Sequence, residues 1–136
     1  MANEAVMLTE DQPAYTFTVA QATGFEKGAL CTLTSPMTAT AASADGFFAG
    51  VVKTEKVANV GTTVSLYRSG IAKMTSSAAI AVGVGVAMTG SGNKVKTSTV
   101  SDTSSKVIGI ALSTTSGDNE TLLVDIRPGA NPAAYA

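Results

Sequence analysis

The sequence lacks the residues on which most protein chemistry depends. Its 136 residues include no His, no Trp and a single Cys. Without His there is no Ser-His-Asp triad, no Cys-His pair and no histidine-ligated zinc or haem. One Cys allows neither an internal disulfide nor a cysteine-cluster metal site. We therefore expect a protein that is not an enzyme, with no catalytic residue, no cofactor and no metal site.

Charge and long apolar runs are also scarce. Charged residues make up 14% of the chain and the formal net charge is -1. Binding to DNA or RNA needs a basic face, so direct contact with nucleic acid is not expected. A membrane helix needs about 20 apolar residues in succession, which the sequence does not contain, so we expect no membrane partner. The start has neither the basic nor the apolar region of a signal peptide, which predicts synthesis in the cytoplasm.

The residues that are present favour β-structure. There are 19 Thr and 13 Ser, and hydrophobic residues make up 45% of the chain. Short segments of β-branched residues alternate with turn residues, which is typical of strands. The pattern predicts an extended N-terminal arm over 1–14, one β domain over 15–127 and a C-terminal tail over 128–136. At most one short helix is expected, near 76–82, where Ser residues precede an Ala-rich run that ends at a Gly.

A weak internal repeat relates residues 25–73 to residues 80–129. Segment 28–34 aligns with 83–89, segment 48–52 with 107–111, and segment 64–70 with 123–129. The last alignment places the two arginines of the chain, Arg68 and Arg127, at equivalent positions. A chance match in a chain rich in Gly and Val is the alternative. If the repeat is real, the two similar halves are expected to close one small, compact β-barrel or sandwich.

Several segments could contact a partner. The apolar patch in the arm belongs either to a disordered terminus or to a segment that adds a strand to a partner's sheet. Each arginine ends a strand, where it could form a salt bridge within the chain or bind a partner's carboxylate. Aromatic residues alternate with Thr in the first strand of the domain. The candidate interface residues are Val6, Met7, Leu8, Tyr15, Phe17, Arg68 and Arg127.

The remaining motifs predict no chemistry. The Gly83-x-Gly85 pair has Met88 where a dinucleotide-binding loop needs a third Gly. Cys31 lies within an apolar strand segment and no His is available as its base, so we expect a buried, inert thiol. The core must be built mainly from small aliphatic side chains, because aromatic residues are only 5% of the chain. Such a core buries little area, which points to self-association or docking onto a larger body.

The spaced Gly and aliphatic pattern resembles a family of tailed-phage capsid decoration proteins, also called cement proteins. The resemblance rests on segments 27–30, 48–52, 68–70, 81–86, 107–112 and 120–126, and extends over about residues 25–127. It implies a β-barrel-like fold and assembly as homotrimers on the outside of the capsid of a virion. It further implies the major capsid protein as partner and stabilisation of the expanded shell. It implies no enzymatic residue.

A second function from a different class remains open. A carbohydrate- or receptor-binding β module on a virion or cell surface would have a similar composition. Such a module usually binds sugars on aromatic platforms, and the chain has no Trp.

Overall fold

The computed structural model describes residues 2–44, 46–99 and 106–129. These residues form eleven β-strands and no helix, which confirms the mainly β fold. The strands are β1 (Val6–Thr9), β2 (Tyr15–Thr18), β3 (Leu30–Ser35), β4 (Thr38–Ala41), β5 (Phe47–Val52), β6 (Thr63–Tyr67), β7 (Gly70–Ser76), β8 (Gly85–Met88), β9 (Lys94–Thr97), β10 (Val107–Ala111) and β11 (Thr121–Ile126).

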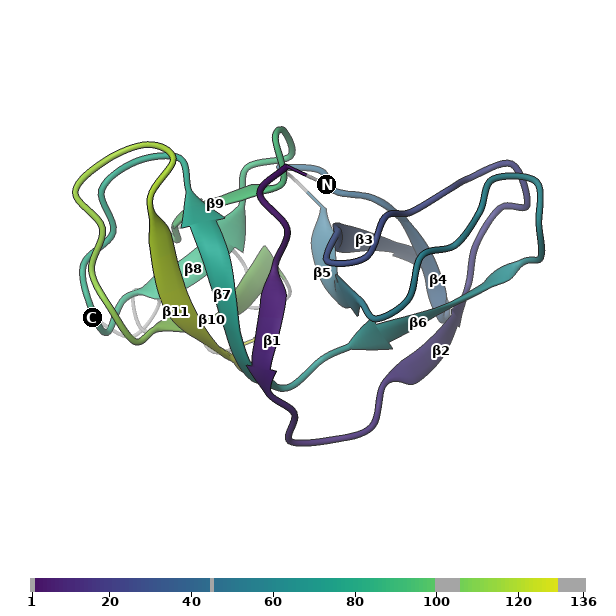
Figure 1. Cartoon of the computed structure of the whole chain (residues 1–136), viewed down its shortest axis with the longest axis horizontal. Helices are drawn as coiled ribbons and strands as arrows, with labels where there is room; N and C mark the ends of the chain where they lie inside the picture. Colours follow the sequence, from purple (N-terminus) through teal and green to yellow (C-terminus); the bar gives the residue numbers. More distant parts are fainter. Residues whose placement is uncertain (1, 45, 100–105, 130–136) are drawn as a thin grey trace.

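The strands form two barrels that lie side by side, with β1 between them (Figure 1). The first barrel closes in the order β2-β4-β3-β5-β6. In the second, β7-β11-β10-β8-β9 closes through a further pairing of β7 with β9. If β2, β3, β4, β5 and β6 are replaced by β7, β8, β9, β10 and β11 in turn, the strand order of the first barrel becomes that of the second. The parallel pairing of β2 with β4 likewise matches that of β7 with β9. The two halves therefore share one topology.

Closure differs in one respect from the expected single barrel. Each half closes on itself because its first strand pairs with both the third and the fifth strand of the same half. Barrel closure satisfies the hydrogen-bonding groups at sheet edges, so neither half needs strands from the other. The result is two similar five-stranded barrels instead of one.

The Ala-rich segment near 76–82 forms no helix. Ser76 ends β7, and Ile80 exchanges backbone hydrogen bonds with Thr115 at N···O distances of 3.1 and 2.9 Å. Phe25 and Lys56 exchange the matching pair in the first barrel, both at 2.9 Å. This isolated bridge between two long loops is thus part of the repeated unit, and tertiary pairing overrides the local helix signal.

Glycines occupy equivalent positions in the two barrels. Gly28 and Gly83 have positive φ of 81° and 87°, and their N–H groups donate to Val52 and Ala111. A Cβ on Gly50 would lie 2.6 Å from the carbonyl oxygen of Tyr67. A Cβ on Gly109 would lie 1.9 Å from the carbonyl oxygen of Asp125. The internal glycines of the repeat therefore mark close approaches between backbones.

The arginine alignment is wrong by one residue. Val52 pairs with Leu66, whereas its counterpart Ala111 pairs with Val124. Within β6 and β11 the offset between the repeats is therefore 58, not 59. The cause is the connection before the last strand, which is one residue shorter in the second barrel (112–120) than in the first (53–62). Arg68 consequently corresponds to Ile126 and not to Arg127.

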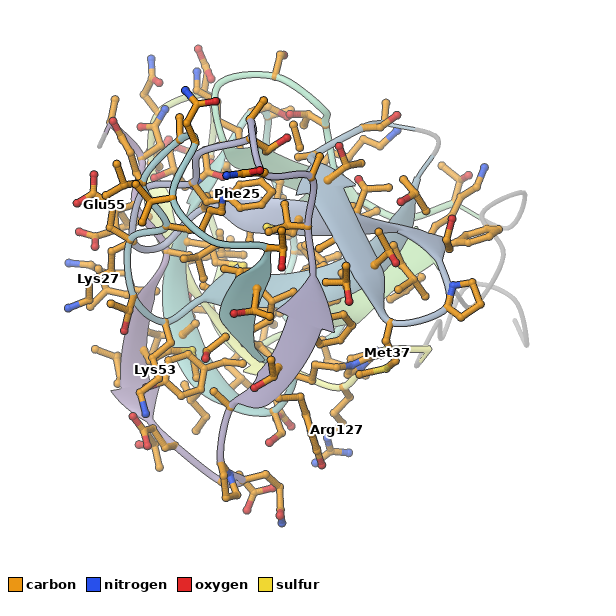
Figure 2. The ribbon with its side chains drawn as sticks, turned by 90° about the vertical axis from the view of Figure 1, so that its right-hand side faces the viewer. Phe25, Lys27, Met37, Lys53, Glu55 and Arg127 are labelled. Atoms are coloured by element: carbon orange, nitrogen blue, oxygen red, sulfur yellow. The ribbon has the colours of Figure 1, made fainter. Side chains whose placement is uncertain are left out.

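Two clusters of buried side chains stabilise the molecule. The smaller lies inside the first barrel and includes Phe17, Phe25 and Leu66. The larger fills the second barrel and also takes in Leu30, Phe48 and Tyr67 of the first barrel. The second cluster therefore extends across the boundary between the barrels, so each thin core is supplemented by packing against its neighbour. Figure 2 looks onto the first barrel, with Phe25 near its upper end.

Candidate interaction surfaces

The N-terminal arm is ordered against its own chain. β1 pairs antiparallel with β7, in the register Val6 to Lys73 and Met7 to Ala72. Just before β1, Ala5 is 5% exposed and belongs to the larger core, and its N–H donates to the Gly28 carbonyl at 3.0 Å. The arm therefore adds a strand to the second barrel while its start contacts the first.

One side chain ties the arm to both barrels. Asn93, in the turn between β8 and β9, donates from Nδ2 to the carbonyl oxygens of Asn3 (2.9 Å) and Gly28 (3.0 Å). Its Oδ1 accepts from the backbone N–H of Leu30 at 2.8 Å. Asn3 returns a bond from its own Nδ2 to the Gly92 carbonyl at 2.7 Å. Asn93 has a φ of 55°, a conformation that Asn adopts more readily than most residues. We call this group of hydrogen bonds the Asn93 latch.

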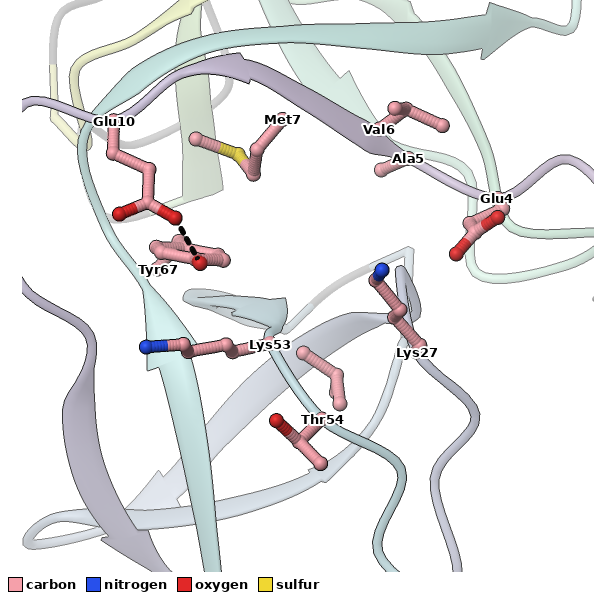
Figure 3. Close-up of a pocket in the computed structure, with 10 residues that line it drawn as sticks. Glu4, Ala5, Val6, Met7, Glu10, Lys27, Lys53, Thr54 and Tyr67 are labelled. Atoms are coloured by element: carbon pink, nitrogen blue, oxygen red, sulfur yellow. Dashed lines mark hydrogen bonds between the residues drawn. The ribbon is translucent and has the colours of Figure 1, made fainter.

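A cleft of about 320 Å³ lies between the arm and the first barrel (Figure 3). Glu4 and Glu10 face it from the arm, and Lys27, Lys53 and Tyr67 face it from the barrel. The hydroxyl of Tyr67 donates a short hydrogen bond to Oε1 of Glu10. The Lys53 ammonium lies 5.8 Å from the centre of the Tyr67 ring, within cation–π range. An acidic arm thus meets a basic barrel surface.

The polar groups of the cleft hold the arm against the first barrel. The hydrogen bond to Glu10, with a smaller contribution from burial, raises the pKa of Tyr67 to about 12. The phenol is therefore neutral at physiological pH and remains a donor to the carboxylate. Cys31 is fully buried, and burial raises the pKa of its thiol to about 12. Among the described residues, no group of three or more His, Cys, Asp or Glu side chains is arranged to hold a metal ion.

The structure separates the candidate residues taken from the sequence. Val6, Leu8 and Tyr15 are 38, 54 and 49% exposed. Met7 is half-buried and packs against the larger core. Phe17 is 2% exposed and lies inside the first barrel, so its side chain offers no surface to a partner.

The two arginines are also placed differently. Arg127 is exposed, and its Nε lies 2.6 Å from Oδ2 of Asp125. Arg68 is half-buried and, within the described part of the chain, forms no salt bridge. A surface pair such as Arg127–Asp125 contributes little to stability. Arg127 thus pairs with a carboxylate of its own chain, whereas no such pair joins Arg68 to a described residue.

Comparison with known families decides the class of the molecule. The family model of the phage cement proteins matches residues 9–126, a range that contains ten of the eleven strands and the end of β1. The chain belongs to the phage cement protein family. It is thus a capsid-associated structural protein of a bacteriophage, and the resemblance noted from the sequence is confirmed.

A solved structure shares the fold of this cement protein. The N base of the head fiber protein gp8.5 of bacteriophage phi29 is similar with a TM-score of 0.56 and 14% sequence identity. The similarity covers 85% of this chain and 94% of that chain. No sequence among the curated proteins matches. Within the described ranges, no helix is long and apolar enough to cross a membrane.

The cement protein also exposes apolar side chains that the sequence did not single out. Two lie near the turn between β3 and β4, two in the long loop of the first barrel, and two in the loops of the second. No local pattern marks them, because the exposure of a side chain in a loop depends on which distant segments pack against it. In that order they are Met37, Phe47, Val57, Val60, Val82 and Leu112, with exposures between 43 and 63%.

Proposed function

We propose that this protein is a decoration protein that binds the outer surface of a phage head, as a homotrimer, and stabilises the expanded shell. The observation that supports this most directly is the match of the cement family over both barrels. The proposed partner is the major capsid protein, and synthesis takes place in the host cytoplasm before assembly onto the virion.

The physical character of the molecule suits this role. Charged residues are only 14% of the chain, and charged side chains are costly to desolvate in a contact surface. The two barrels share a core and are joined by the Asn93 latch, so they form a rigid body that loses little conformational entropy on docking. Many identical weak contacts on a symmetric shell then add up through multivalency.

The arm is proposed to contact the shell from its place on the second barrel. Val6 and Leu8 lie on either side of Met7 in β1. Both side chains are exposed while Met7 packs against the larger core, so both face away from that core. We call Val6 and Leu8 the apolar strip of the arm, and Tyr15 at the start of β2 is a further exposed residue proposed for the contact. Docking through this strip does not require the arm to unfold.

The test is reconstitution on capsids that lack the protein. Expanded and unexpanded shells are mixed with increasing protein, and bound copies are counted by mass measurement and by image reconstruction. We expect saturable, symmetric binding to the expanded shell. Leu8→Asp is expected to weaken binding, whereas Val57→Asp, at a similarly exposed apolar residue far from the strip, serves as the matched control. No saturable binding by the unaltered protein would refute the proposal.

The alternative of a carbohydrate-binding module gains no support from the cleft. Its one aromatic ring, Tyr67, already has its hydroxyl bound to Glu10 and its face beneath Lys53. A sugar would have to displace both contacts. A glycan screen is the corresponding test, and we expect no specific binding.

A further inference from the structure

The two barrels of one chain contact each other through unlike surfaces. The second barrel contributes the turn between β8 and β9, whose Asn93 side chain bonds to Gly28 and Leu30. The same turn packs tightly on the first barrel, since a Cβ on Gly90 would lie 2.4 Å from the backbone nitrogen of Ala44. The first barrel contributes the face around Gly28. A contact of this kind is heterologous, and it leaves one unused turn and one unused face at the ends of the molecule.

The unused turn is that between β3 and β4 of the first barrel. Met37 is the counterpart of Asn93: each has positive φ (48° and 55°) and each directly precedes the third strand of its barrel, β4 or β9. Positive φ is unfavourable for Met, which lacks the short polar side chain that lets Asn adopt it. Yet Met37 is 52% exposed, and its thioether has no hydrogen-bond donor with which to replace the bonds that Asn93 makes. In Figure 2 it lies across the first barrel from Lys27 and Lys53.

The described surroundings of Met37 are uncharged and partly apolar. Phe47 is 47% exposed, and a groove of about 240 Å³ runs between it, Leu33 and Pro36. Thr34 and Ser35 complete its lining, and none of the described residues that line it is charged. We call Pro36, Met37 and Phe47 the apolar turn. The apolar turn thus presents an uncharged side chain at a residue with unfavourable backbone geometry, whereas the corresponding turn of the second barrel presents the polar side chain of Asn93.

The unused face is that around Gly83 in the second barrel. At Gly28, its counterpart, the arm covers the backbone, and an added Cβ would lie 2.1 Å from Cγ of Glu4. At Gly83 an added Cβ would meet no atom of the described residues within 4 Å. The face that is covered in the first barrel is therefore open in the second.

The side chains that flank the two faces differ accordingly. Lys27 and Lys53 line the cleft beneath the acidic arm in the first barrel. Their counterparts in the second barrel are Val82 and Leu112, which are 61 and 43% exposed. They flank the hydrogen bond that joins Gly83 to Ala111 at 2.8 Å. We call Val82, Gly83 and Leu112 the open face. An uncharged face is complementary to an uncharged turn and not to another acidic arm.

We infer that the apolar turn of one copy docks on the open face of a second copy, repeating between chains the contact that joins the barrels within a chain. The occupant of the open face is thus another molecule of this protein. The inference rests on the self-association included in the proposed function and names the surfaces that perform it. Because the contact is heterologous, copies joined in this way form either a closed ring or an open chain.

The experiment measures association of the full chain by native mass spectrometry and by light scattering over a dilution series. Met37→Asp and Val82→Asp place a carboxylate in the contact, and Asp tolerates positive φ at position 37. Each is expected to raise the midpoint concentration for association about tenfold or more, because the charge must be desolvated. Val60→Asp is the matched control, since Val60 is 63% exposed but lies on a loop of the first barrel outside the contact. Circular dichroism confirms that each variant is folded.

Two further variants make the assignment specific. Met37→Asp combined with Val82→Lys in one chain places opposite charges at every contact and is expected to restore association. Met37→Cys combined with Val82→Cys is expected to give disulfide-linked oligomers, since Cys31 is fully buried and does not compete. The mass of the largest cross-linked species counts the copies, with three expected from the proposed trimer.

The outcomes separate this inference from the proposed function. Unchanged association of Met37→Asp and Val82→Asp, or the absence of cross-linking, would overturn the inference even if the protein binds capsids. Association through this contact without capsid binding would refute the proposed function and leave the inference standing. A closed oligomer of another size would support the contact and refute the trimer.

Discussion

Removing the Asn93 side chain should loosen the contact between the barrels. Asn93→Ala eliminates the acceptor of the Leu30 N–H and the donors to Asn3 and Gly28. Leu30 is 2% exposed, so its N–H loses its partner without gaining water, at a cost of about 1–3 kcal/mol. The two lost donated bonds add about 0.5–1.5 kcal/mol each. The Gly28 carbonyl keeps its bond from Ala5, which limits the total to about 2–4 kcal/mol for the hydrogen bonds.

Backbone strain must be separated from this loss. Ala at a φ of 55° costs about 1–2 kcal/mol beyond the hydrogen bonds, whereas Gly does not. Asn93→Gly is therefore expected to lose the hydrogen-bond contribution alone. Asn59→Ala provides the matched control for strain, because Asn59 has a φ of 64° in an exposed loop.

The assay is urea unfolding followed by circular dichroism and Tyr fluorescence. We expect Asn93→Gly to lower the free energy of unfolding by about 2–4 kcal/mol and Asn59→Ala by about 1–2 kcal/mol. Separate transitions for the two barrels in Asn93→Gly would further support the latch. A loss below about 0.5 kcal/mol in Asn93→Gly would refute the reasoning, because it would mean that these bonds contribute nothing net to the native state.

Two other predictions concern the ionisation of Tyr67 and the close backbone approach at Gly109. The raised pKa of Tyr67, about 12 against 10 for a free phenol, means that the folded state holds this proton more tightly. Its contribution to stability is therefore complete below pH 10 and is lost as the pH rises from 10 through 12. Tyr67→Phe should show a shallower loss over that interval in denaturation at pH 9 and 11; equal slopes would contradict the assignment. Gly109→Ala should prevent the second barrel from closing, because its Cβ would lie 1.9 Å from a backbone oxygen. Gly83→Ala, with open space around it, should cost only about 1–2 kcal/mol of backbone strain. Similar unfolding midpoints for the two glycine variants would show that the close approach at Gly109 relaxes without cost.

The local signals in the sequence identified most strands of the two barrels and the repeat. Gly28 and Gly83 align because both turns need positive φ, and Gly50 and Gly109 align because both strands approach another backbone closely. Such requirements act on single positions, so they are visible in the sequence. They support the mainly β fold with two similar halves without any knowledge of tertiary contacts.

The features that escaped prediction depend on distant pairings. Closure into two barrels depends on parallel strand pairings such as that of Thr18 with Thr38. No local sequence pattern predicts such a pairing. The alternation that predicts a strand at 15–19 does not show that Phe17 points inward while Tyr15, at the start of the strand, remains half exposed. The apparent match of Arg68 with Arg127 fails because one loop is a residue shorter.

The candidate surfaces were predicted only in part. The apolar residues of the arm were identified, since an apolar patch in a polar terminus is unusual in itself. Their attachment to β7 was not, because either a partner's edge or the chain's own edge could accept the strand. The apolar turn and the open face emerge only when the two barrels are compared residue by residue.

The central claim is that the protein stabilises an expanded phage shell, and one measurement tests it most directly. Expanded heads without the protein are titrated with it, and the temperature at which the shell breaks and releases DNA is recorded at each occupancy. The account predicts a disruption temperature that rises with occupancy and levels off when the symmetric sites are full, with a smaller rise for Leu8→Asp. A disruption temperature that stays constant while the sites fill would contradict it.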